Sequence, residues 1–227
     1  IKVLMSDGTD PANDLKVYGE EHTYVSSPLD LDGDGIADIE YAATKKNLGK
    51  VLLELSERMT EKDHLIFYVV DHGSRNEKEP LISYICLWGD DVRLYPEELS
   101  EMLKGINAGY MTLVFGQCNS GGFIPCLQAD NRLVMAACQA DESSFCRMEE
   151  PYDEFVYQWT SALAGCTPYG DPVDADYDKN GVVTLLEAYR YAEENDGYKD
   201  GDFSFGDVRE HPMASYLVGT NIEDLSL

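Results

Sequence analysis

The chain has 227 residues, which is enough for one domain with a sizeable core and too few for two. It carries 17 basic and 43 acidic residues, so its formal net charge is −26. Such acidity argues against nucleic acids and anionic membranes as partners, because both would repel it. No apolar run reaches the roughly 18 residues of a membrane-spanning helix. We therefore expect a single domain over residues 1–227 without a membrane span.

A short predicted strand at residues 1–5 is followed by an acidic loop at residues 30–41 that resembles half of an EF-hand loop. The ligands that its spacing predicts are Asp30, Asp32, Asp34, Ile36 and Asp38. Tyr41 stands at the last position, where a bidentate glutamate is expected, so Asp38 or Glu40 must complete the site. The alternative is an acidic turn without an ion. Crowded carboxylates repel one another, however, which favours bound Ca²⁺.

Two runs of branched and aromatic residues, 64–70 and 111–115, predict strands buried on both faces of a parallel sheet. His72 follows the first run and Cys118 follows the second. Sites of open α/β sheets form beyond the carboxyl ends of strands, so neighbouring strands would bring this imidazole and this thiol to one edge. Either residue alone is more often structural, but the pair suits a base and a nucleophile. Gly73 would let backbone N–H groups approach a ligand.

The remaining elements predict an α/β domain with a mostly parallel sheet flanked by helices. Thr44 can cap a helix before the histidine strand, and a helix at 96–106 connects the two strands, as a parallel pair requires. The other expected elements are a hairpin at 81–91, strands at 132–137 and 213–218, and helices at 153–164 and 184–194. The cysteine spacings predict neither a zinc site nor a disulfide framework, with Cys118 expected to be free.

A second acidic loop, residues 176–187, matches the EF-hand pattern over its full length, with Gly181 at the turn position. The ligands predicted for Ca²⁺ are Asp176, Asp178, Asn180, Val182 and Glu187. The segment before this loop predicts no helix, so a complete helix-loop-helix is not expected. Two calcium sites of modest affinity suit an extracellular or periplasmic setting better than a resting cytosol.

Four stretches carry a resemblance to a known family. Residues 63–74 resemble the histidine strand of the legumain family of caspase-like cysteine peptidases, and residues 117–121 resemble its cysteine motif. Residues 134–137 and 141–144 resemble the next strand and the substrate-binding loop after it. The resemblance spans residues 44–165. With its two acidic loops the chain resembles a bacterial-type member.

The resemblance implies a caspase-like three-layer sandwich, with the calcium loops inserted, that acts as a cysteine endopeptidase on peptides or proteins. Cys118 would attack the peptide carbonyl, His72 would protonate the leaving amine, and the N–H groups of Gly73 and Cys118 would hold the oxyanion. Alternatives are a calcium-dependent binding or structural module that has lost activity, and a transpeptidase or ligase with the same dyad. The family's first strand and helix are not found here. The alternatives are an upstream piece of the same precursor that is cleaved away, one that stays associated and completes the sheet, and a segment that this chain does not include.

Specificity is where the chain departs from the family, whose members resemble one another in an acidic residue two positions before the nucleophile. This chain has Gly116 there, so we expect an open pocket floor with charge supplied by acids of the later loop. Such a pocket favours lysine or arginine over aspartate before the cleaved bond. The alternative is that the acids face solvent and the pocket accepts small or apolar residues. The expected substrate contacts are Gly116, Gln117, Asp141, Ser143, Ser144, Glu149 and Glu150.

Overall fold

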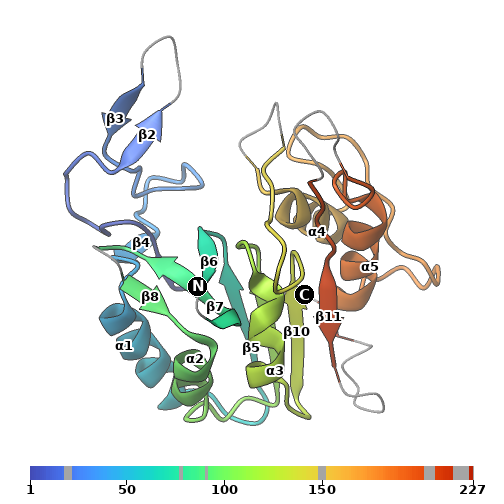
Figure 1. Ribbon diagram of the computed structural model, residues 1–227, viewed down its shortest axis with the longest axis horizontal. Coiled ribbons are helices and arrows are strands. Elements are labelled where there is room, and N and C mark those ends of the chain that lie inside the picture. Colours follow the sequence, from blue (N-terminus) through green and yellow to red (C-terminus); the bar gives the residue numbers. More distant parts are fainter. Residues whose placement is uncertain are drawn as a thin grey trace.

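A central sheet of four strands organises the protein (Figure 1). The computed structural model describes residues 1–17, 22–76, 79–89, 92–147, 152–201, 208–216 and 225–226. The strands lie in the order β11 (Met213–Ser215), β10 (Arg132–Ala136), β9 (Tyr110–Phe115) and β5 (His64–Val69). Strands β5, β9 and β10 are parallel, whereas β11 runs antiparallel to β10.

Helices cover both faces of this sheet, which gives three layers (Figure 1). One face packs on α1 (Lys45–Ser56), α2 (Pro96–Leu103) and α3 (Ile124–Leu127), and the other on α4 (Glu154–Ala164) and α5 (Leu185–Asn195). Side chains alternate along β9, with Leu113 and Phe115 on the first face and Val114 on the second. The expected α/β class is confirmed.

Local signals in the sequence explain where the long helices begin. The hydroxyl of Thr44 accepts from the N–H of Asn47, and the carboxylate of Asp153 accepts from the N–H of Val156. A capping box between Thr184 and Glu187 starts α5. These caps satisfy N–H groups that have no partner within the helix, so each helix starts at a defined residue.

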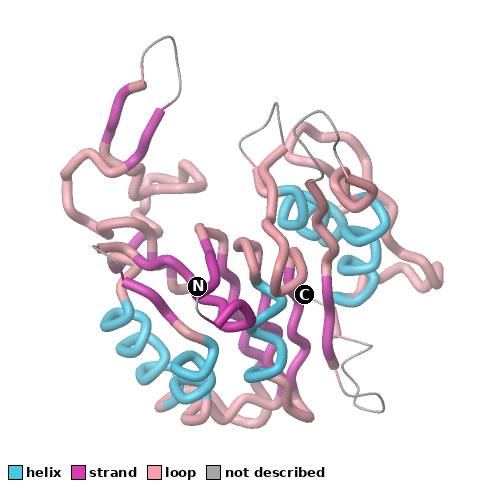
Figure 2. The backbone as a smooth tube through the Cα atoms, viewed as in Figure 1, coloured by secondary structure: helices cyan, strands magenta, loops and turns pink. Residues whose placement is uncertain are grey.

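Three smaller sheets surround the central one. Strands β1 (Val3–Leu4) and β4 (Ile39–Tyr41) form a parallel pair. Strands β2 (Leu15–Val17) and β3 (Thr23–Val25) form an exposed hairpin that projects from the body (Figures 1 and 2). Strands β6 (Gly73–Asn76), β7 (Glu79–Leu87) and β8 (Val92–Leu94) form an antiparallel sheet that leads from the histidine strand toward α2.

Several expectations change in detail. The expected hairpin at 81–91 is part of a three-stranded sheet, and the helix expected to end at residue 106 ends at Leu103. The last strand makes the central sheet partly antiparallel, and the β2–β3 hairpin was not expected. All six cysteines are free thiols. Within the part of the chain that the structure describes, no helix has the length and apolar character needed to cross a membrane.

Candidate active site

The register of the central sheet brings His72 and Cys118 to the same edge. Val69 and Phe115 are the last paired residues of β5 and β9, and the N–H of Gly116 then donates to the carbonyl of Val69 at 2.9 Å. His72 and Cys118 each lie three residues beyond that last pair. Because parallel strands end together, the imidazole and the thiol follow matching turns at one end of the sheet.

Gly73 packs directly on the backbone beside the thiol. A Cβ at Gly73 would overlap the carbonyl oxygen of Cys118 and would lie 2.5 Å from Cγ of Gln117. The peptide group between His72 and Gly73 is held from the other side, because the carbonyl of His72 accepts from the N–H of Cys86 at 2.9 Å. Glycine is therefore required for this close approach of the two strand ends.

A sharp turn places the thiol between β9 and the short 3₁₀ helix η1 (Ser120–Phe123). Asn119 has the left-handed conformation, with φ of 58°. Its side-chain amide donates to the carbonyl of Ala140 at 3.0 Å, and its N–H donates to the carbonyl of Glu142 at 2.9 Å. The turn that carries Cys118 is thus fixed to the loop that follows β10.

That same loop contacts the thiol itself. The half-buried Cys118 Sγ donates to the carbonyl of Ser144 at 3.5 Å, and His72 is exposed. Asp141 and Ser143 are exposed, whereas Glu142 binds His211, with its Oε1 2.6 Å from His211 Nδ1. The structure therefore brings the loop to the thiol. Glu149 and Glu150 lie outside the described residues.

The expected open pocket floor at Gly116 is wrong. Gly116 is buried, and a Cβ there would lie 2.8 Å from Cγ2 of Val156 and 3.6 Å from Oδ1 of Asp153. The space beside this glycine is filled by the first turn of α4. Gln117 is 1% exposed, so its side chain faces the interior instead of a substrate.

Buried acids near Ser144 were missed by the sequence analysis. Asp153 lies 2.6 Å from the Ser144 hydroxyl, and burial raises the pKa of its carboxyl to about 6. Burial also raises the pKa of Asp196 to about 7 and that of Glu210 to about 10. Asp153 could have been noticed as the residue before a helix, but nothing in the sequence indicates that these acids are buried together.

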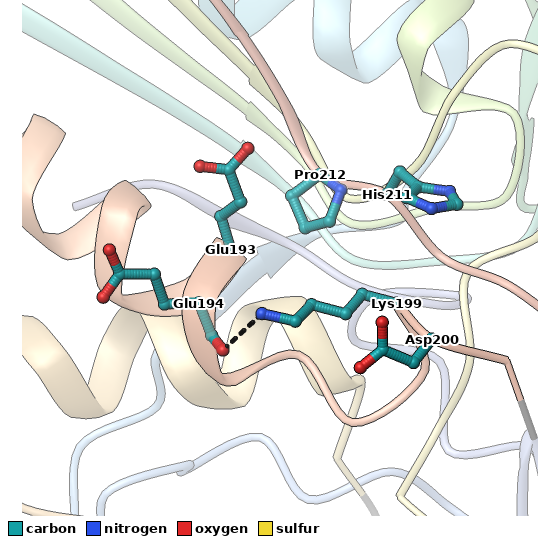
Figure 3. Close-up of a pocket in the computed structure, with 6 residues that line it drawn as sticks. All are labelled: Glu193, Glu194, Lys199, Asp200, His211 and Pro212. Atoms are coloured by element: carbon teal, nitrogen blue, oxygen red, sulfur yellow. Dashed lines mark hydrogen bonds between the residues drawn. The ribbon is translucent and has the colours of Figure 1, made fainter.

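A surface cavity of about 370 Å³ lies beside the last turn of α5. It is lined by Glu193, Glu194, Lys199, Asp200, His211 and Pro212. The ammonium of Lys199 donates to the carbonyl of Glu194 at 2.8 Å across it (Figure 3). Neither His72 nor Cys118 lines this cavity.

The first acidic loop gathers three carboxylates. Oxygens of Asp30, Asp32 and Asp38 all lie within 4.8 Å of one another. Asp34 is outside this group, and its Oδ1 accepts from the N–H of Ile36 at 2.8 Å. Glu40 pairs with Lys2, so Asp38 is the acid that completes the group. Three converging carboxylates fit a hard divalent cation such as Ca²⁺.

The second acidic loop gathers Asp176, Asp178 and Glu187, whose oxygens also lie within 4.8 Å of one another. Gly181 has φ of 90°, as the sharp turn of such a loop requires. The side-chain oxygen of Asn180 accepts from the N–H of Val182 at 2.8 Å. This donor set of oxygens also fits Ca²⁺.

An imidazole and a thiol at one edge of a helix-flanked sheet are the groups that a cysteine peptidase requires. The family model described as the peptidase C13 family matches residues 20–165, which is more than half of the chain. The chain therefore belongs to this family, the legumain family of cysteine peptidases.

Two further comparisons extend this result. No curated protein matches the chain. The crystal structure of protein GSU0716 from Geobacter sulfurreducens is similar, with a TM-score of 0.50 and 13% sequence identity. The alignment covers 78% of this chain and 75% of that chain. At this identity the similarity concerns the α/β fold alone.

Proposed function

We propose that the protein is a cysteine endopeptidase with a dyad of Cys118 and His72. The observation that carries the proposal is the packing of Gly73 on the Cys118 backbone, which brings the two strand ends into contact. The His72 imidazole takes the proton of the Cys118 thiol, and the resulting thiolate adds to the carbonyl carbon of a peptide bond. The N–H groups of Gly73 and Cys118 receive the oxyanion. His72 then gives its proton to the amine as the C–N bond breaks. Water hydrolyses the thioester and returns the thiol and the imidazole to their starting states.

We further infer that the residue before the cleaved bond is lysine or arginine. Asp153 supports this through its charge alone, because the space beside Gly116 is filled by α4, whereas the Asp153 carboxyl, with a pKa of about 6, is mostly ionised at neutral pH. The exposed acid Asp141 adds negative charge to the same loop. Glu149 and Glu150 lie outside the described residues and enter the proposal only through the negative charge of their side chains. Fixed negative charge near the thiol favours a cationic side chain before the cleaved bond and disfavours an aspartate there.

One experiment with two readouts tests the proposed function. A fluorogenic peptide library varied before the cleaved bond should show cleavage, fastest after lysine or arginine. A thiol probe should label Cys118 selectively, and His72→Ala should slow this labelling, whereas Cys166→Ala at an exposed thiol should not. Preference for aspartate would reject the specificity. Labelling without cleavage would favour a binding or structural module, and products joined to an added amine would favour a transpeptidase.

We also propose that both acidic loops bind Ca²⁺ and stabilise the native fold. When bound, the ion would neutralise carboxylates that otherwise repel one another. Asp30, Asp32 and Asp38 would hold one ion. Asp176, Asp178 and Glu187 would hold the other, with the oxygens of Asn180 and Val182. Sites of this kind suit a calcium-rich extracellular or periplasmic compartment.

Removing calcium should lower the melting temperature. An ion at 100 times its dissociation constant stabilises a fold by about 2.7 kcal/mol, or roughly 5–10 °C for a chain of this size. Glu187→Gln should remove most of the rise in melting temperature that calcium gives through the second loop. The exposed control Glu57→Gln should leave this rise unchanged. Differential scanning calorimetry with and without a chelator measures this. Equal melting temperatures in both conditions would reject the proposal.

Finally, we infer that an upstream segment of the same precursor covers the outer side of β5. Ile66, Tyr68 and Val70 are 40%, 42% and 50% exposed although they belong to an apolar run. Among the described strands, β5 pairs only with β9. An apolar surface beside a free strand edge suits an added strand. Co-expression with the preceding segment should slow amide hydrogen exchange in β5, and unchanged exchange would exclude this partner.

A further inference from the structure

The hydroxyl of Ser144 lies between two carboxyl groups, those of the half-buried Asp153 and the buried Glu210. Its Oγ is 2.6 Å from Oδ2 of Asp153 and 3.0 Å from Oε1 of Glu210. A serine hydroxyl has a single proton, so it can donate to only one of these oxygens. The other contact is a hydrogen bond only if the carboxyl carries a proton and donates it to Ser144. One of the two acids is therefore neutral in this arrangement.

Three observations assign that proton to Glu210. The 2.6 Å contact has the length of a hydroxyl that donates to a carboxylate, which identifies Asp153 as the ionised partner. The other oxygen of Asp153 accepts from the N–H of Val156 at the start of α4, where a helix favours negative charge. Glu210 is 0% exposed, and burial raises its pKa to about 10.

The charged groups around Glu210 also favour its neutral form. Asp153 at the start of α4 and Asp196 at the end of α5 both raise its pKa by electrostatic repulsion. The guanidinium of Arg147 lies 3.1 Å from the buried carboxylate of Glu154 and is directed there. Proton binding is thus the simplest way for Glu210 to stay buried beside other acids.

The loop after β10 contributes the other titratable groups. The thiols of Cys138 and Cys146 are close enough to Glu210 for its charge to raise their pKa values. The imidazole of His211 bonds to Glu142 at 2.6 Å. These thiols are themselves protonated at neutral pH, since burial raises both pKa values.

Glu210 also holds the backbone beside the nucleophile. Its Oε2 accepts from the N–H of Phe145 at 2.8 Å. The carbonyl of the preceding residue, Ser144, accepts from the thiol of Cys118 at 3.5 Å. One carboxyl group therefore fixes two consecutive residues of the loop that contacts the thiol.

We propose that Glu210 is a positioning residue that acts as a neutral hydrogen-bond donor. Its carboxyl O–H donates to Ser144, the Ser144 hydroxyl donates to Asp153, and the loop is thereby held against Cys118. The role in catalysis rests on the proposed peptidase function. When Glu210 loses its proton, two carboxylates compete for one hydroxyl proton and the loop loses a contact.

Two substitutions separate the neutral acid from an ionised one. In Glu210→Gln the amide can donate to Ser144 and accept from Phe145, so kcat/KM at pH 6 should stay within about threefold of wild type. Glu210→Leu has similar volume but leaves both partners unsatisfied, so kcat/KM should fall at least about tenfold. Glu193→Gln makes the same change at an exposed residue and serves as the control.

The pH dependence of unfolding tests the proton without any activity. The folded-state pKa of Glu210 is raised from 4.5 to about 10. The folded state therefore binds one more proton than the unfolded state between these values, and this contribution to stability is lost as pH rises toward the folded pKa. One proton changes the folded-to-unfolded ratio about tenfold per pH unit. Asp153 and Asp196 also make the free energy of unfolding depend on pH, and they do so in both proteins. The difference in pH dependence between wild type and Glu210→Gln therefore isolates the contribution of Glu210.

Urea unfolding at pH 6, 7 and 8 should show a steeper loss of stability for wild type and for Glu193→Gln than for Glu210→Gln. Equal slopes would overturn the proposal, because Glu210 would then be ionised in the folded state. If Glu210→Gln shows the shallower slope but Glu210→Leu keeps full peptidase activity, the positioning role alone is overturned. Absence of cleavage by the wild type would reject the proposed function, and the slopes would still decide the state of Glu210.

Discussion

Replacing Cys118 with alanine should abolish peptide hydrolysis while changing the free energy of unfolding by no more than about 1–2 kcal/mol. The side chain is half-buried, and its one described hydrogen bond is the long contact from its thiol to the carbonyl of Ser144. Removing the sulfur therefore removes the proposed nucleophile and little packing. His72→Ala should lower kcat by about 10²–10⁴, because the leaving amine loses its general acid.

Steady-state cleavage and urea unfolding measure these two effects separately. Cys166→Ala, at an exposed thiol in another part of the fold, is the matched control and should keep full activity. If Cys118→Ala still cleaves peptides at the wild-type rate, Cys118 is not the nucleophile.

Gly73→Ala should reduce kcat/KM at least about a hundredfold, since a displacement near 1 Å at a reacting group can cost that much. The added methyl group would meet the Cys118 carbonyl oxygen and, at 2.5 Å, Cγ of Gln117. The carbonyl belongs to the backbone of the turn that carries Cys118, so the two strand ends must separate. Circular dichroism should remain close to that of the wild type, because the sheet core does not include this contact.

Gly49→Ala provides the same chemical change without the collision. Gly49 lies inside α1, and a Cβ there meets nothing within 4 Å. Alanine in a helix interior is more stable than glycine by about 0.5–1 kcal/mol, so this variant should be fully active and slightly stabilised. Equal activity of the Gly73→Ala and Gly49→Ala proteins would show that the close approach of the strand ends is not needed.

The strands that carry His72 and Cys118 could be predicted because the necessary information is local. Unbroken apolar runs indicate strands, and polar residues and glycine mark their ends. The expected burial on both faces holds for β9 but is wrong for β5, where Ile66 and Tyr68 are 40% and 42% exposed. The parallel register then follows from the α/β pattern, as the Val69–Phe115 pairing illustrates. The helix starts at Thr44 and Thr184 could be read for the same reason, since a cap depends on residues within one turn.

Other parts of the site depend on packing between distant segments. Glu210 and Ser144 are separated by 66 positions, and no periodicity relates them. The expectation of an open pocket floor at Gly116 was wrong. The sequence shows that Gly116 has no side chain, but it does not show that Val156 occupies the space. The β2–β3 hairpin was missed because its side chains are exposed and lack the alternation of a half-buried strand.

Among the described residues, no strand pairs with β5 on the side away from β9, and this has a consequence for the behaviour of the chain in solution. A strand edge beside exposed apolar side chains can pair with the same edge of a second molecule, which is the first step of aggregation. The formal charge of −26 opposes that encounter, because like-charged molecules repel at long range. Salt screens this repulsion over about 10 Å at 0.1 M ionic strength. The negative charge of the protein therefore opposes aggregation. This repulsion weakens as the ionic strength of the solution rises.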